Sequence, residues 1–386
     1  MNSLKLMILS IAGAILNGIA GLVAARTLGP LQFGSFASAI AAITVLQVLL
    51  QGFQFSSQNE FKRDSLENRG QSLNLKMWLF RNFLPLVALI TTLLIAFRET
   101  LKFTVPQSLG IIAMILPTLA LSSIAGFHLW NKDLVRYQLL SSQVALLRLM
   151  LSMCAAILIS LFPKLNGPAL FILALIIGSN IVVAYNWLRT PKAVQPGNFV
   201  VKKEAMHFIL LITSSWLLMQ GDIIVLNSTL DPKSAGTYAA YSSLAKVLIT
   251  FFGLYGLHVA TRYTAIASLS DRISVAFRSA ALAFIMILLA IIFGDQILVF
   301  LYGERFAVES VSVELLYASS AIWAVFFALL YMRINTIRTL FIPNTMIMIL
   351  FFSILSLTTV PLTVGSVYAI STISGVLGLI VLVFKN

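Results

Sequence analysis

The sequence is built from twelve apolar segments of about 20 residues, separated by short polar connections. A helix rises about 1.5 Å per residue, so a segment of this length crosses the hydrocarbon core of a bilayer. Only 10% of the 386 residues are charged, which is too little polar surface to cover a water-soluble globule. The segments comprise residues 4–28, 33–55, 77–97, 109–130, 138–162, 168–188, 205–229, 235–259, 279–301, 311–332, 341–360 and 364–384. We therefore predict an all-α, multi-pass membrane protein with twelve transmembrane helices.

The basic residues are distributed unevenly between the two sides of these segments. Of the 26 Lys and Arg residues, 18 fall in connections on the side of the N-terminus, 6 on the opposite side and 2 inside segments. Because basic residues concentrate on the cytoplasmic side of a membrane, this bias predicts that both termini are cytoplasmic. The formal net charge of +13 is thus mainly an orientation signal. No basic stripe interleaved with aromatic residues indicates a nucleic-acid partner, and we expect none.

The polar connections are too short to hold a catalytic domain, and the sequence contains no Walker-type phosphate-binding loop. The single Cys154 can form neither an intrachain disulfide nor a zinc site, and we expect it to be buried. None of the three histidines stands at metal-ligand spacing from another. We therefore expect a transporter and not an enzyme, with no cofactor and no metal site.

A short motif occurs twice, 202 positions apart. Residues 28–37 and residues 230–239 both have the pattern L-x-P-x-x-x-G-x-(aromatic)-A. Each copy lies between the first two apolar segments of one half of the chain, where Pro suits the start of a helix and Gly allows helices to approach closely. We therefore predict two six-helix bundles, residues 1–190 and 205–386, joined by a cytoplasmic linker at 191–204. An even number of helices makes the bundles parallel repeats, with a cavity between them.

Three charged residues are clear cases of a charge well inside an apolar segment, where an unpaired charge is costly: Arg148, Asp222 and Lys246. Asp222 and Lys246 are each 12 residues from position 234, inside the turn between two segments, so two antiparallel helices would place them at the same depth. One interpretation is a buried ion pair that fixes the hairpin. The other is a pair that faces a cavity, in which the carboxylate exchanges a proton or cation while the ammonium group engages substrate.

Arg148 has no acidic residue at a comparable depth in its own half of the chain. A guanidinium group is permanently charged and binds phosphate oxygens in pairs, so it suits a diphosphate head group. The alternative is that Arg148 pairs with backbone carbonyl groups or with Asp222.

A polar stripe runs along the second apolar segment. Thr44, Gln47, Gln51, Gln54 and Gln58 fall within about 80° of one another on a helix of about 3.6 residues per turn. Amide groups both donate to and accept from hydroxyl groups, so the stripe predicts a cavity wall that contacts sugars. Hydrogen bonding between helices is the alternative.

Three segments resemble the Wzx-type oligosaccharide flippases of the multidrug/oligosaccharidyl-lipid/polysaccharide exporter superfamily, which also contains the MATE drug exporters. Residues 25–34 are similar to the family pattern A-R-x-L-G-P-x-x-F-G, and residues 222–239 to its D-x-x-x-L…G-x-Y-x-x-A stretch. Residues 302–306 are similar to its Y-G-x-x-F turn.

The resemblance implies a MATE-like fold in a bacterial inner membrane. It implies a flippase that carries undecaprenyl-diphosphate-linked oligosaccharide units, of O-antigen or a related surface polysaccharide, from the cytoplasmic to the periplasmic leaflet by ion-coupled alternating access. Expected partners are membrane lipids, the polysaccharide polymerase and the chain-length machinery. The expected substrate-binding residues are Arg148, Lys246 and, from the family motif, Arg26, and the expected ion-coupling residue is Asp222.

Two other functions are consistent with a membrane protein of this length. A MATE-type exporter of small cations would need an acidic cavity, whereas the intramembrane charges are two basic residues and one acidic residue. A membrane-embedded polymerase or glycosyltransferase would need a large outer loop with catalytic residues, and the outer connections are short.

Overall fold

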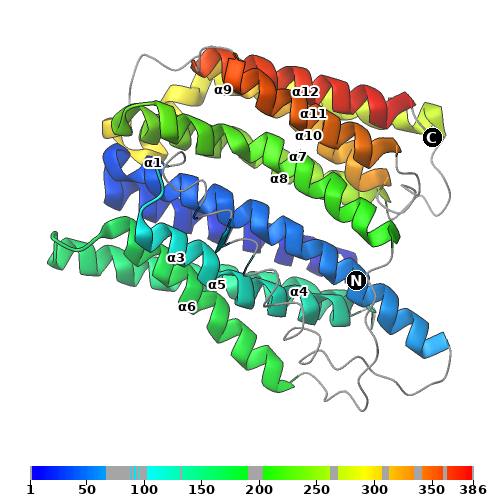
Figure 1. The fold of residues 1–386 in the computed structure, drawn as a ribbon, viewed down its shortest axis with the longest axis horizontal. Coiled ribbons are helices and arrows are strands. Elements are labelled where there is room, and N and C mark those ends of the chain that lie inside the picture. The colour runs from blue at the N-terminus through cyan, green and yellow to red at the C-terminus, as the bar shows by residue number, and fades with distance from the viewer. Residues whose placement is uncertain are drawn as a thin grey trace. The chain divides into compact units, whose positions relative to one another are not determined.

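The computed structural model consists entirely of helices and their connections over the residues that it describes (Figure 1). These residues are 2–66, 88, 91–92, 95, 102–130, 133–189, 203–260, 268–306, 313–333, 341–359 and 363–384. The chain divides into two compact units, residues 1–209 and residues 210–386. The predicted segment 77–97 and the predicted linker 191–204 lie almost entirely outside the described residues.

The helices of the two units follow the apolar segments of the sequence. The N-terminal unit contains α1 (Asn2–Leu66), α3 (Val105–Ala113), α4 (Ile115–Trp130), α5 (Leu134–Leu161) and α6 (Gly167–Arg189). The C-terminal unit contains most of α7 (Lys203–Thr229), then α8 (Pro232–Ala260), α9 (Leu269–Tyr302), the short η1 (Glu304–Phe306), α10 (Val313–Arg333), α11 (Phe341–Thr359) and α12 (Val364–Phe384). Seven stretches within the described residues are long and apolar enough to cross a membrane, and the count of twelve spans stays a prediction.

Helix α1 is kinked at the first copy of the repeated motif. Gly29 has φ 65° and ψ 174°, a conformation outside the helical region that glycine adopts without a steric penalty. Pro30 follows, and because it lacks a backbone N–H it interrupts the hydrogen-bond ladder. The kink separates two limbs, residues 2–28 and 30–66. At the second copy the helices separate fully, and Pro232 begins α8.

The predicted segment 109–130 is two helices, α3 and α4, and not one. Pro117 explains the break, because its ring clashes with the carbonyl group four residues earlier, at Ala113. The Met114 N–H bonds to the Gly110 and Ile111 carbonyl groups and closes α3. The buried Gln107 caps the start of α3 and donates a 3.0 Å hydrogen bond to the Ser35 carbonyl oxygen, which ties α3 to the second limb of α1.

The core of the C-terminal unit forms around α10, which packs against α8, α9 and α12. Trp323, Phe326 and Phe327 are fully buried and contact one another through tilted and edge-on ring pairs. Glycines make the approach of α12 possible, because a Cβ at Gly378 would lie 2.8 Å from the Phe326 ring. This packing holds α8 in place against α10.

The outward faces of the helices are apolar. On α5, Met150, Met153 and Ile157 are each more than half exposed. Cys154 lies beside them and is also exposed, so the prediction that it is buried is wrong. A small apolar thiol fits a lipid-facing surface as well as it fits a core, and an apolar sequence context does not separate the two.

Candidate functional site

Arg148 is positioned by a close contact between α5 and α6. A methyl group at Gly178 would lie 3.3 Å from the Arg148 backbone nitrogen and 3.4 Å from the Leu147 carbonyl carbon. The absence of a side chain at this glycine therefore lets the two backbones touch. The contact brings the neighbouring Ser179 beside the Arg148 side chain.

The Arg148 guanidinium group is only partly used within the protein. Its Nη2 donates a 3.0 Å hydrogen bond to Ser179 Oγ, which itself donates to the Leu175 carbonyl oxygen at 2.8 Å. The Arg148 Nε is buried and has no hydrogen-bond acceptor. In the part of the chain that the structure describes, no carboxylate lies within 4 Å of this group. Arg148 therefore carries a positive charge and an N–H donor that no group among the described residues satisfies.

Arg148 lines a cavity of about 290 Å³ inside the N-terminal unit. The lining residues come from both limbs of α1, the α3–α4 junction, α5 and α6, so the two limbs of α1 lie side by side. They are Asn17, Ala20, Gly21, Phe36, Ile40, Ile43, Thr44, Gln47, Met114, Arg148, Ser152 and Leu175. Seven of these lining residues are apolar. The polar ones carry amide or hydroxyl groups, except Arg148, which is the one charged residue among the described residues of the lining.

Two members of the predicted polar stripe, Thr44 and Gln47, line this cavity. The Thr44 hydroxyl group donates a 2.8 Å hydrogen bond to the Ile40 carbonyl oxygen, which leaves its lone pairs free to accept. The helix continues to Leu66, but the side chains of Gln51, Gln54 and Gln58 lie outside the described residues.

The structure does not bring Arg26 to this cavity. Arg26 lies five residues beyond Gly21, which rotates it by about 140° around the helix axis. It is exposed and is not among the lining residues. The family motif identified it, but the motif carries no information about which side of the helix faces the cavity.

Asn17 and Ser152 are lining residues to which the sequence analysis assigned no role. Asn17 is an amide in the first apolar segment, and Ser152 lies one turn after Arg148, where it is 2% exposed. In the sequence, each is simply a polar residue inside an apolar segment. This pattern is a weak predictor of a cavity-lining residue, because Ser is common in membrane helices.

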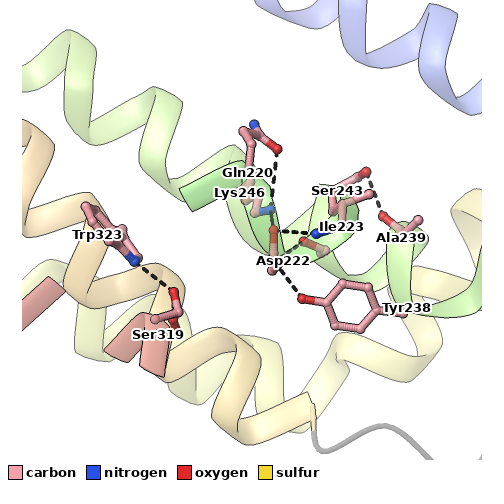
Figure 2. A network of polar contacts seen from close by, with 11 residues as sticks. Gln220, Asp222, Ile223, Tyr238, Ala239, Ser243, Lys246, Ser319 and Trp323 are labelled. Carbon is pink, nitrogen blue, oxygen red and sulfur yellow. Dashed lines mark hydrogen bonds and ion pairs between the residues drawn. The ribbon is translucent and has the colours of Figure 1, made fainter. Parts of the chain in front are cut away.

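Asp222 and Lys246 form an ion pair between α7 and α8, with 2.6 Å between Lys246 Nζ and Asp222 Oδ1 (Figure 2). Asp222 and Lys246 are equally far along the chain from the turn between α7 and α8, and this spacing predicts the pair. The two side chains are only 7% and 10% exposed. The ammonium group also contacts Gln220 Oε1 at 3.4 Å. The pair lies in the C-terminal unit, and Arg148 lies in the N-terminal unit, where its hydrogen-bond partner is Ser179.

The Asp222 carboxylate is saturated with hydrogen bonds. Its Oδ1 also accepts from the Ile223 backbone N–H at 2.7 Å, and its Oδ2 accepts from the Tyr238 hydroxyl at 2.6 Å (Figure 2). Oδ2 also accepts from Ser242 Oγ at 3.2 Å. Tyr238, Ser242 and Lys246 are spaced four residues apart along one face of α8. Tyr238 and Ser242 are two candidate functional residues that were not predicted from the sequence, and their spacing of eight and four residues from Lys246 was the available signal.

The turn between these two helices is capped by Asp231. Its Oδ1 accepts hydrogen bonds from the backbone N–H groups of Lys233 and Ser234, both at 3.1 Å. Hydrogen bonds from Ser234 to the ionised carboxylate lower the pKa of Asp231 below its ordinary value. The carboxylate is therefore ionised at neutral pH and stabilises the start of α8.

Solved structures with a similar fold cover nearly the whole chain. A multidrug-resistance MATE family transporter of the MOP superfamily matches 95% of this chain and 92% of its own, at 14% identity and a TM-score of 0.65. A eukaryotic MATE transporter matches 100% and 96%, at 12% identity and a TM-score of 0.63. The lipid II flippase MurJ matches 98% and 87%, at 13% identity and a TM-score of 0.62. No protein-family model and no curated protein matches the sequence. The chain therefore has the fold of the MATE and MOP-superfamily transporters.

Proposed function

We propose that the protein is a flippase that moves an oligosaccharide linked through a diphosphate to a polyprenyl lipid across a bacterial inner membrane. The cargo is undecaprenyl-diphosphate-linked oligosaccharide, carried from the cytoplasmic to the periplasmic leaflet. The observation that carries the proposal is Arg148, a cationic residue that lines a cavity, whose buried Nε has no hydrogen-bond acceptor and which has no carboxylate within 4 Å among the described residues.

A diphosphate fits this arrangement chemically. Its oxygens are anionic acceptors, and a guanidinium group presents donors in the planar geometry that binds two of them at once. Asn17, Thr44 and Gln47 offer amide and hydroxyl groups to the sugar hydroxyls. The cavity is smaller than a whole lipid-linked oligosaccharide, so it would receive the head group next to the lipid.

Export of small cations is the second candidate, because the similar solved structures include MATE transporters. The charge of the cavity favours the lipid cargo, since Arg148 would repel a cation and none of the described lining residues is acidic. The third similar structure is a flippase for a lipid, so the fold is compatible with cargo of that kind.

The Asp222–Lys246 pair is the proposed ion-coupling element. In this proposal the carboxylate takes up a proton or a cation, which releases the Lys246 ammonium group, and the change in the α7–α8 hairpin accompanies alternating access. The saturated carboxylate supports a strongly held resting state, because four hydrogen bonds must rearrange before Asp222 can change its charge.

The test is Arg148→Ala in the purified full-length protein, with Arg189→Ala as the control. Arg189 lies at the end of α6 with its guanidinium group 4.0 Å from the Tyr185 ring centroid. We expect Arg148→Ala to weaken binding of undecaprenyl diphosphate, measured by native mass spectrometry, by about 10-fold to 100-fold, because hydrogen bonds to a charged group contribute about 1.5–3 kcal/mol. Arg189→Ala should bind the lipid as the wild type does.

Arg148→Ala should also fail to complement a flippase-deficient strain while it is still inserted in the membrane. Complementation at the wild-type level would contradict the role of Arg148. Unchanged lipid binding, together with stronger binding of a cationic dye in Arg148→Ala, would favour the export of small cations.

A further inference from the structure

Ser179 on α6 contacts Arg148 from behind the wall of the cavity. Its side chain is 0% exposed, and it is not among the described residues that line the cavity. A head group in the cavity is therefore out of reach of the Ser179 hydroxyl group. Any influence of Ser179 on binding has to act through Arg148.

The hydroxyl group of Ser179 can serve Arg148 only as an acceptor. A serine hydroxyl group has one hydrogen, and Ser179 donates it to the Leu175 carbonyl oxygen at 2.8 Å. This bond within α6 fixes the hydroxyl rotor and leaves a lone pair of Oγ for the 3.0 Å bond from Arg148 Nη2. Hydrogen bonds from a charged donor are stronger than those between neutral groups. The end of the guanidinium group is thus tied to the α6 backbone through Ser179.

The bond to Ser179 leaves one complete edge of the guanidinium group. The planar group has five N–H donors, and Nη2 contributes one hydrogen to each of two donor pairs, one shared with Nε and one with Nη1. Ser179 accepts one of these hydrogens, so the other pair of parallel donors stays intact. Among the described residues, the Arg148 side chain makes no other hydrogen bond. Two phosphate oxygens can therefore be bound in parallel by a group whose orientation is already set.

We propose that Ser179 is a positioning residue, which holds the Arg148 guanidinium group in its binding orientation before an anionic head group arrives. A free arginine side chain samples many rotamers, and immobilising it on binding costs conformational entropy. An arginine that is already fixed in the unbound protein loses less of this entropy, so it binds the same anion more tightly. The role rests on the proposed function, because it concerns the same site.

The test is a titration of the purified full-length protein in detergent with inorganic pyrophosphate, a probe that has the diphosphate but neither lipid nor sugar. A ligand that binds the folded state raises the unfolding temperature in a saturable way, and the ionic strength is kept constant. We expect Ser179→Ala to raise the half-saturating concentration about 2-fold to 10-fold, because immobilising the released arginine now opposes binding.

Ser215→Ala is the matched control for this substitution. Ser215 is also 0% exposed and also donates to the carbonyl oxygen four residues earlier, at Leu211, but it belongs to the C-terminal unit. We expect its half-saturating concentration to equal that of the wild type. Ser179→Thr keeps a hydroxyl acceptor that can make the same bond within the helix, and it should restore tight binding.

A double variant separates positioning from a merely structural role. Arg148→Ala should weaken pyrophosphate binding, and adding Ser179→Ala should not weaken it further, because the positioned group is gone. Equal weakening by Ser179→Ala with and without Arg148 would overturn the proposal. So would a wild-type half-saturating concentration in Ser179→Ala, or a wild type that does not respond to pyrophosphate.

Two further results keep the proposal separable from folding defects and from the identity of the cargo. If Ser179→Ala does not fold, Ser179→Cys offers only a weak acceptor and should also raise the half-saturating concentration. Wild-type binding by Ser179→Cys would then overturn the proposal. A wild type that binds pyrophosphate in this Ser179-dependent way, but does not bind undecaprenyl diphosphate, would contradict the proposed cargo and support the role of Ser179.

Discussion

Removing the ammonium group of Lys246 should strongly destabilise the C-terminal unit. Lys246→Met keeps a long, unbranched side chain but leaves the buried Asp222 carboxylate without its counter-ion. Removing one partner of a buried pair costs about 3–5 kcal/mol, and the side chains of this pair are at most 10% exposed. In a domain of about 150–250 residues, 1 kcal/mol lowers the unfolding temperature by about 2–4 °C. We therefore expect a decrease of about 6–20 °C.

The measurement is fluorescence-monitored unfolding of the purified protein in detergent. Lys233→Met is the matched control, because Lys233 is an exposed lysine in the first turn of the same helix. Its effect should stay within about 0.5 kcal/mol. Asp222→Asn combined with Lys246→Met removes both charges, so the double variant should be more stable than Lys246→Met alone.

Two results would refute this reasoning. An unfolding temperature of Lys246→Met within about 2 °C of the wild type would mean that the pair contributes little stability. A double variant no more stable than Lys246→Met would mean that the two charges are not coupled. The same double variant also tests ion coupling, because ion-driven flipping by a protein without either charge would contradict the proposed role of Asp222.

The same substitution at two glycines should have opposite effects. Gly178→Ala forces a Cβ against the α5 backbone and should lower stability by about 1–3 kcal/mol, whereas Gly21→Ala, whose Cβ meets nothing within 4 Å, should raise it by about 0.5–1 kcal/mol. Thermal unfolding of both variants checks the two signs, and equal shifts would contradict the close α5–α6 contact. Gly21→Trp should fill the cavity and abolish undecaprenyl diphosphate binding while the protein stays folded, and retained binding would place the lipid site elsewhere. Because the pKa of Asp231 is lower in the folded state, its ionised carboxylate stabilises the fold at pH values above the ordinary Asp pKa of about 3.9. This stabilisation is lost as the pH falls through the lower pKa of the folded state. Acidification from about pH 6 to about pH 3 should therefore lower the unfolding temperature more in the wild type than in Asp231→Asn, and parallel curves would exclude the cap as a source of stability.

The elements of the fold follow from patterns that the sequence carries locally. Apolar segments of membrane-spanning length predict the helices, and the repeated Leu-x-Pro pattern predicts both breaks, at Pro30 and Pro232. The Asp222–Lys246 pair was also predictable, because two antiparallel helices joined at a known turn have a fixed register. The division of α3 from α4 was missed because Pro117 lies inside an apolar segment and was counted as part of it.

The partners of the charged residues could not be predicted, because they depend on which helices cross and at what distance. Ser179 meets Arg148 only because Gly178 lets α5 and α6 touch. The resemblance to flippases identified Arg26, but not the direction in which its side chain points.

The described residues that line the cavity around Arg148 all lie between Asn17 and Leu175, so they all belong to one unit. A head group bound there is held by groups whose mutual distances are set by packing within that unit. If one unit moved relative to the other, the bound head group would therefore move together with the N-terminal unit and keep its contacts. Release would then require competition from water or lipid at the mouth of the cavity, or a local change such as separation of α5 from α6 at Gly178.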